Sequence, residues 1–219
     1  MEHAFWHDKW ARKEIGFHLP EAHPWLVKHI ESHPLSKNDV VFVPLCGKTH
    51  DIGLFLKQGV KVIANELSES AIVELFSELG LTPKISSWKN HGQCYQADLL
   101  TVYVGDFFKL TQNELKDVTR IYDRAAIVAL PDTMRAQYSE QLKTFCADAK
   151  HWLMTLEYDQ DKMSGPPFSV TESEVIEHYS NSYQINTVIR RDVIDQEPRF
   201  KEKGLSSFVQ CFYELEPSK

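Results

Sequence analysis

The stretch Val40-Val41-Phe42-Val43-Pro44-Leu45-Cys46-Gly47-Lys48-Thr49-His50-Asp51 decides the fold. Its first four residues are β-branched or aromatic, which is typical of a strand that is covered on both faces. Pro44 has no N–H to donate, so we expect it to end that strand. Gly47 lets the backbone turn, and Thr49 or Asp51 is expected to cap the helix that begins near Ile52. The stretch therefore predicts a strand, a tight turn and a helix.

A second strand follows this helix and ends in an acidic residue. The run Lys61-Val62-Ile63-Ala64-Asn65-Glu66 is apolar in its middle and reaches the carboxylate at its last position. A strand, a glycine-containing turn, a helix and a strand that ends in an acid form the pattern of a nucleoside-binding βαβ unit.

The remaining sequence alternates between the two element types up to residue 158 and then becomes rich in strands. This order predicts a doubly wound α/β sheet that closes with a hairpin-like pair of strands. We expect one domain over residues 1–219, with an N-terminal helical segment at 1–36 and the sheet core at 37–219. The expected elements are helices at 69–80, 131–147 and 172–179, a strand-rich region at 85–104 with a turn at 90–92, and strands at 120–124, 151–158, 183–191 and 207–214.

The N-terminal segment is rich in aromatic residues. Phe5, Trp6 and Trp10, and later Trp25, recur at three- to four-residue spacing, which predicts two short helices. The loop between them contains Gly16-Phe17-His18-Leu19-Pro20. Two interpretations stay open: the segment pads the edge of the sheet, or it forms a lid with Trp10 and Phe17 facing a ligand.

Composition excludes several classes of partner. The chain has 24 basic and 31 acidic residues, a formal net charge of −7, and no basic block, so it is expected to repel nucleic acid and anionic membranes. Its four cysteines form no CxxC pair, which favours reduced thiols in the cytoplasm. There is no signal peptide pattern, and no apolar run approaches the roughly 20 residues that span a bilayer. We expect a cytoplasmic monomer without nucleic-acid or membrane partners.

The turn after the first strand argues against phosphate binding. Gly47-Lys48-Thr49 resembles the end of a P-loop, but position 42 is Phe where that motif needs glycine. The dinucleotide pattern GxGxxG also fails, because Gly47 is the only glycine in the turn. A ligand with a nucleoside and no phosphates remains, with its ribose hydroxyls accepted by Glu66. S-adenosylmethionine meets that description.

The chain resembles the bacterial thiopurine S-methyltransferase family along nearly its whole length. The resemblance lies in six motifs at family-like spacing: Phe5-Trp6 with Trp10, Gly16-Phe17-His18, Pro44-Leu45-Cys46-Gly47-Lys48, Glu66-Leu67-Ser68, Tyr122-Asp123-Arg124-Ala125 and Gly165-Pro166-Pro167-Phe168.

The resemblance implies a fold, a cofactor and a reaction. The fold is a class I methyltransferase sheet of seven mostly parallel strands, with helices on both faces, an antiparallel last strand and an N-terminal helical lid. The methyl donor is S-adenosylmethionine, and the acceptor is a small heteroaromatic thiol such as a thiopurine. Selenium or tellurium oxyanion methylation, and donor binding without thiopurine turnover, are the alternatives.

The resemblance also assigns residues to the two ligands. It places Phe17 and Arg199 at the acceptor. The residues that it places at the donor are Trp10, Leu45, Glu66, Asp106, Phe107 and Arg124.

Catalysis of such a transfer is mainly positioning, because the sulfonium already activates the methyl carbon. A heteroaromatic thiol is acidic enough to need no strong base. We therefore predict that Arg124 and Arg199 act as catalytic residues that favour the thiolate by their charge. A structural ion pair of Arg124 with Asp123 or another acid is the alternative.

Other reactive residues fit structural roles better. Cys46 has no His and acid at readable spacing, which favours a small buried residue over a nucleophile. The pairs His3/His7 and His29/His33 are four residues apart but lack a third ligand, so no metal site is predicted. His18 forms a loop hydrogen bond or relays a proton from a less acidic thiol.

Overall fold

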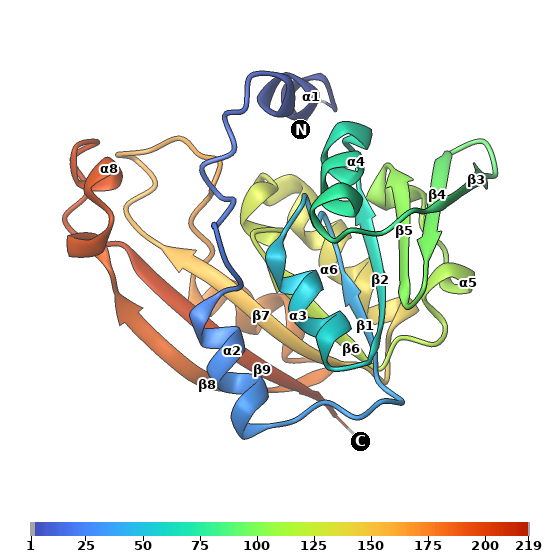
Figure 1. Ribbon diagram of the computed structural model, residues 1–219. Helices are drawn as coiled ribbons and strands as arrows, with labels where there is room; N and C mark the ends of the chain where they lie inside the picture. The colour runs from blue at the N-terminus through green and yellow to red at the C-terminus, as the bar shows by residue number, and fades with distance from the viewer. Residues whose placement is uncertain (1–2, 219) are drawn as a thin grey trace. The chain divides into compact units, whose positions relative to one another are not determined.

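The computed structural model describes residues 3–218, and these form two compact units, 3–120 and 121–218. Figure 1 shows both units and their labelled elements. The expected single domain, with a helical segment at 1–36 followed by the sheet core at 37–219, stays a prediction. No helix in the described range is long and apolar enough to cross a membrane.

The N-terminal unit begins with two helices and contains five strands in the order β3-β4-β5-β2-β1. The two short helices expected before the first strand are confirmed. The elements are α1 (His3–Ala11), α2 (Pro24–Ser32), β1 (Val40–Val43), α3 (His50–Lys57), β2 (Lys61–Glu66), α4 (Glu69–Glu78), β3 (Lys84–Trp88), β4 (Gly92–Ala97), β5 (Leu100–Gly105) and α5 (Gln112–Leu115), with a 3₁₀ turn at Phe107–Lys109.

The strand-turn-helix prediction for the deciding stretch is confirmed. All four residues of β1 are buried, and the strand ends immediately before Pro44. β1 pairs in parallel with β2, and β2 pairs in parallel with β5. Thr49 caps α3 by accepting a hydrogen bond from the Asp51 backbone N–H at 3.3 Å. The parallel pairing brings the carboxyl ends of β1, β2 and β5 to one edge of the sheet.

The number of strands differs from the predicted seven, because the described chain contains nine. The residues 84–105 hold three strands, with β4 antiparallel to both β3 and β5. Gly92 and Gly105 are opposite each other in this pairing, and both have a positive φ, +149° and +150°. A Cβ at Gly92 would lie 1.9 Å from the carbonyl oxygen of Val104, so only glycine permits this approach.

The C-terminal unit contains four strands in the order β6-β7-β9-β8. β9 pairs antiparallel with both β7 and β8, which confirms the antiparallel last strand and the final pair. The elements are β6 (Arg120–Arg124), α6 (Asp132–Phe145), β7 (Lys150–Glu157), α7 (Glu172–Tyr179), β8 (Tyr183–Asp192), α8 (Pro198–Lys201) and β9 (Val209–Pro217), with 3₁₀ turns at Ile127–Ala129 and Ile194–Gln196.

A polar group is buried in the core of this second unit. Asp123 on β6 accepts hydrogen bonds from the Tyr138 hydroxyl at 2.7 Å and from the Ile127 N–H at 3.1 Å. The ring of His151 on β7 lies 3.9 Å from the same carboxylate, and both side chains are fully buried. Burial raises the pKa of Asp123 to about 6 and lowers the pKa of His151 to about 3.

Candidate functional site

The turn after β1 has an unusual backbone. Leu45 adopts φ +46° although it is not glycine, and Gly47 follows at φ +53°. The Cys46 N–H between them donates to the carbonyl oxygen of Asn65 at 2.9 Å, which fixes the turn beside the end of β2. A non-glycine residue in the left-handed region costs about 1–2 kcal/mol. Such strain is concentrated at ligand sites, so Leu45 marks this corner as a candidate site.

Glu66 closes the same corner from the end of β2. Its side chain is 6% exposed, and its two carboxylate oxygens accept hydrogen bonds from the backbone N–H groups of Gly47 and Ser68, both at 2.8 Å. Burial raises the pKa of Glu66, while these backbone donors oppose the shift. Each carboxylate oxygen has two lone pairs, so the fixed carboxylate can still accept hydroxyl groups.

Two aromatic residues from the N-terminal segment cover Gly47. A Cβ on Gly47 would lie 3.1 Å from the indole of Trp10 and 3.7 Å from the ring of Phe17. Trp10 is 8% exposed and meets Phe17 edge to face, with ring centroids 5.8 Å apart. Gly47 is therefore needed both for its backbone angle and for the close approach of Trp10.

A cavity of about 500 Å³ begins at Leu67, the residue after Glu66. This volume is typical of small-molecule sites. The cavity lies at the carboxyl ends of β2 and β5, with α1 contributing one wall. Its lining comes from α1, the start of α4, the turn between β3 and β4, and the end of β5, and includes His7, Ala11, Ser68, Ser70, His91 and Gln93.

Asp106 and Phe107 follow β5 directly and differ in orientation. The half-buried Asp106 caps a 3₁₀ turn by accepting from the Phe108 N–H at 3.0 Å. Phe107 is 3% exposed and stacks on Phe42 of β1, with ring centroids 6.5 Å apart. The Phe107 ring belongs to the core, so a role at the adenine falls to its backbone.

The N-terminal unit thus brings together Trp10, Phe17, Leu45 and Glu66, while both predicted catalytic arginines belong to the C-terminal unit. Arg124 is the last residue of β6 and is half-buried. Arg199 lies on α8, where it pairs with Glu197 at 3.1 Å and its guanidinium lies 4.6 Å from the centre of the Phe200 ring.

Lys48, in the P-loop-like Gly47-Lys48-Thr49, forms two ion pairs within the protein. Its ammonium lies 2.8 Å from Glu74 and 2.7 Å from Glu78, both on α4. These contacts raise the pKa of Lys48 and occupy its charge within the protein. The ion pairs are consistent with the sequence argument against phosphate binding here.

Sequence reasoning missed the cavity lining at Ser70, His91 and Gln93. Ser70 is four residues beyond Glu66, where the next helix begins, and this position was the available signal. His91 and Gln93 offered no signal, because their place depends on the hairpin of β3 and β4 packing against β5.

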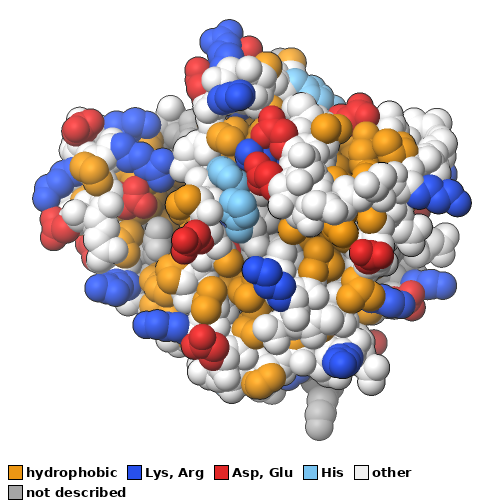
Figure 2. All heavy atoms as spheres, in the orientation of Figure 1, with side chains coloured by type: hydrophobic (Ala, Val, Ile, Leu, Met, Phe, Trp, Pro, Cys, Tyr) orange, Lys and Arg blue, Asp and Glu red, His pale blue; other side chains and the backbone are white. Residues whose placement is uncertain are grey.

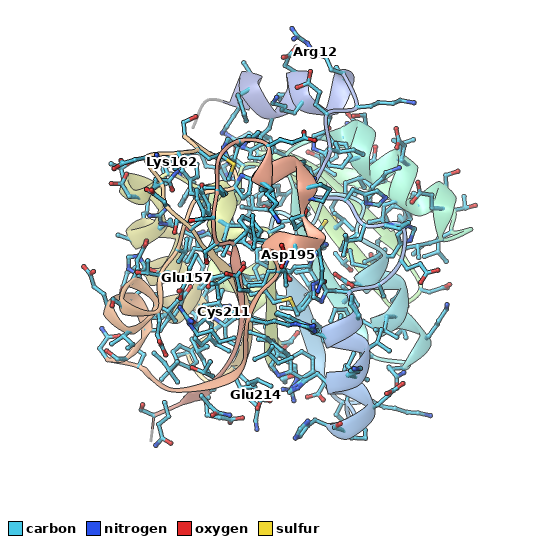
Figure 3. The ribbon with its side chains drawn as sticks, turned by 90° about the vertical axis from the view of Figure 1, so that its left-hand side faces the viewer. Arg12, Glu157, Lys162, Asp195, Cys211 and Glu214 are labelled. Carbon is cyan, nitrogen blue, oxygen red and sulfur yellow. The ribbon has the colours of Figure 1, made fainter. Side chains whose placement is uncertain are left out.

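The cysteines show no sign of an activated thiol. All four are free, and Cys46 is buried with its pKa raised well above the usual value by burial and by Glu66. Cys211 on β9 donates to Glu157 on β7 at 3.6 Å, and Figure 3 shows these two labelled residues close together. Burial raises the pKa of Cys211 to about 11. These thiols are protonated at neutral pH, which supports a packing role for them.

Comparison with solved structures shows the fold. A 1,6-didemethyltoxoflavin-N1-methyltransferase from Burkholderia thailandensis, solved with S-adenosylhomocysteine, matches with a TM-score of 0.64 at 15% identity, covering 98% of this chain and 87% of that one. A methyltransferase from Anabaena variabilis, described as SAM-dependent, matches with a TM-score of 0.64 at 11% identity, covering 99% and 95%. These matches show a class I methyltransferase-like fold.

Sequence comparison shows the family to which the chain belongs. The family model described as thiopurine S-methyltransferase matches residues 1–218. A thiopurine S-methyltransferase from Pseudomonas fluorescens is 42% identical over 216 residues, covering 98% of this chain and 99% of the relative. One from Teredinibacter turnerae is 46% identical over 194 residues, covering 88% and 89%. The chain belongs to the thiopurine S-methyltransferase family.

The residues present fit S-adenosylmethionine. The Glu66 carboxylate is held by two backbone donors, Trp10 packs directly on Gly47, and a cavity adjoins Leu67, the residue after Glu66. A carboxylate fixed in this way has lone pairs left to accept the ribose hydroxyls of the donor. None of the six residues predicted at the donor is among the residues that line the cavity.

Proposed function

We propose that this methyltransferase acts on the sulfur of a heteroaromatic thiol such as a thiopurine. The observation that carries the proposal is the family match over residues 1–218, combined with the aromatic cover of Trp10 and Phe17 over the Leu45–Gly47 turn. Aromatic faces attract a sulfonium through cation–π interaction and stack on a flat heteroaromatic acceptor.

In this proposal the chain supplies orientation and charge. When bound, S-adenosylmethionine supplies a methyl carbon that its sulfonium already activates. Trp10, Leu45 and Glu66 hold the donor, and Asp106 and the Phe107 backbone lie on the adenine side. Phe17 contacts the acceptor, whose thiol proton leaves to solvent before transfer. The rate enhancement comes from fixing donor and acceptor at the right separation.

Arg124 and Arg199 are proposed to favour the acceptor thiolate, with Arg124 also contacting the donor. A nearby positive charge lowers the pKa of a thiol. Arg124→Met should therefore move the acidic limb of the kcat profile, which reports the bound thiol, to higher pH, and Arg199→Met should do so if it shares this role. Profiles that keep the wild-type midpoint while overall activity falls would instead assign these arginines to structure.

An acceptor screen tests the substrate class. Purified protein with S-adenosylmethionine is assayed against a thiopurine, a simple aromatic thiol, an alkyl thiol and selenite, and S-adenosylhomocysteine is quantified. We expect the highest kcat/KM with the thiopurine. Turnover of selenite alone would favour the selenium and tellurium alternative, which the relatives described above do not favour. The monomeric state and the cytoplasmic location stay predictions, and sedimentation tests the first.

A further inference from the structure

A cluster of metal-binding side chains lies beside the aromatic cover, and neither the family nor the sequence pattern assigns it. His18 comes from the loop between α1 and α2, His50 is the first residue of α3, and Glu78 is the last residue of α4. One ligand atom from each lies within 4.8 Å of the other two. The two imidazole rings have centroids 5.2 Å apart and are tilted by 38°. Three separate segments thus converge on one point.

We propose that His18, His50 and Glu78 form a site for a divalent transition-metal ion of the zinc class. Two imidazoles and a carboxylate, with water as the fourth ligand, are a common donor set for Zn²⁺. Bond lengths of about 2.0–2.2 Å place tetrahedral ligand atoms about 3.3 Å apart, so binding needs a contraction that side-chain rotation on an exposed glutamate and a loop histidine can supply.

The ion pairs around the site leave Glu78 able to bind a cation. Lys48 is 2.7 Å from Glu78 but also 2.8 Å from Glu74, so Glu74 can keep the ammonium while Glu78 turns an oxygen toward a metal. Lys13 also interacts with Glu74, so the two lysines and the two glutamates around the site balance in charge. Figure 2 shows histidine side chains next to acidic and basic ones on this face, below α1.

Metal binding would restrain the segment that covers Gly47. His18 directly follows Phe17, and the Phe17 ring is close to Gly47 and to Trp10. An ion shared by His18, His50 and Glu78 would fasten the loop between α1 and α2 to both α3 and α4. The site would therefore act as a clasp, meaning that the bound ion holds Trp10 and Phe17 against the turn. This proposal does not depend on which acceptor is methylated.

The first test is spectroscopic. Metal-free protein carrying Cys94→Ser, which removes the half-buried thiol, is titrated with Co²⁺ and with Zn²⁺ at neutral pH. We expect one equivalent bound and a visible spectrum of tetrahedral cobalt without a thiolate charge-transfer band. An octahedral spectrum identical to free cobalt would overturn the proposal.

Matched variants assign the ligands. His50→Ala and Glu78→Gln should each weaken Zn²⁺ binding by about 100-fold or more, since even outer partners of metal ligands contribute about 10- to 100-fold. The control is His33→Ala, which removes the histidine at the C-cap of α2 that stacks on His29. An equal loss in His33→Ala, or wild-type affinity in His50→Ala, would contradict the assignment.

Proteolysis tests the clasp itself. Arg12 and Lys13 are exposed at the end of α1, and Figure 3 shows Arg12 extending outward. Zn²⁺ should slow tryptic cleavage there in the wild type by several-fold and leave the rate in His50→Ala unchanged. Metal binding without any protection at Arg12 and Lys13 would reject the clasp.

Discussion

Gly47 is the residue on which the corner between β1 and α3 depends. Its φ of +53° and the 3.1 Å approach of Trp10 to a Cβ position are two separate demands. Only the first concerns the backbone. The second concerns the packing of Trp10 and Phe17 on the turn.

Gly47→Ala separates these demands when it is compared with Gly59→Ala. Gly59 also has a positive φ, +75°, but a Cβ there meets nothing within 4 Å. Both substitutions should lower the free energy of unfolding by about 1–2 kcal/mol through the left-handed backbone. Gly47→Ala alone should also weaken binding of S-adenosylhomocysteine, measured by calorimetry. Equal donor affinity in the two variants would show that Trp10 does not organise the site.

Glu66 carries the prediction for the ribose. Glu66→Gln keeps the size of the side chain but removes its charge and one of its acceptor oxygens. A hydrogen bond to a charged group contributes about 1.5–3 kcal/mol, so donor affinity should fall about 10- to 100-fold. The substitution also removes an acceptor for the Gly47 or Ser68 N–H group, which lowers the stability of the fold. Urea unfolding measures this loss of stability separately from the loss of donor affinity. A stable variant with unchanged affinity would contradict the ribose role.

At the scale of elements, Asp123 on β6 and His151 on β7 form a buried pair that makes the stability of the C-terminal unit depend on pH. His151 has a native pKa of about 3, below its unfolded value, so its stabilising contribution is present above pH 6.5 and is lost as the pH falls. Asp123 has a native pKa of about 6, above its unfolded value, so its contribution is present at low pH and is lost as the pH rises toward 6. Between pH 7 and 5 the two contributions oppose each other.

His151→Leu should reveal the contribution of Asp123. In the wild type, acidification from pH 7 to 5 costs about 2 kcal/mol through His151 and adds about 1 kcal/mol through Asp123. The variant should therefore become more stable by about 1 kcal/mol over this range, as measured by urea unfolding at each pH. A variant that loses stability on acidification as the wild type does would refute the assignment to His151.

The elements that the sequence predicted are those with local signals. Pro44 ended β1, Thr49 capped α3, and the run before Glu66 formed β2, because each depends on residues near in sequence. The strand-rich region predicted at 85–104, with its turn at 90–92, is confirmed, but the count of seven strands is wrong because the described chain contains nine. Pairing across a sheet is a tertiary effect, and propensity does not contain it.

The candidate site follows the same division. The acid at the end of β2 and the single glycine in the turn were visible in sequence, and both proved to meet through the hydrogen bond from Gly47 to Glu66. The meeting of His18, His50 and Glu78 was not visible, because these residues are far apart in the chain and come together only when the N-terminal unit folds. The core position of Phe107 was also hidden, since neighbouring Asp106 and Phe107 point to different surroundings.

At the scale of the whole molecule, the central claim is methyl transfer to the sulfur of a heteroaromatic thiol. The family shows a methyltransferase, while the structural neighbour from Burkholderia thailandensis is described as an N1-methyltransferase. A thiopurine contains both sulfur and ring nitrogens, so the position of the methyl group distinguishes these chemistries.

The most direct measurement uses S-adenosylmethionine labelled with ¹³C in its methyl group, a thiopurine acceptor and nuclear magnetic resonance of the product. We predict one labelled S-methyl thioether for each S-adenosylhomocysteine formed, and loss of this product in Glu66→Gln at low donor concentration. A labelled N-methyl product, or donor binding with no methyl transfer to the thiopurine or to any other aromatic thiol, would contradict the proposed function.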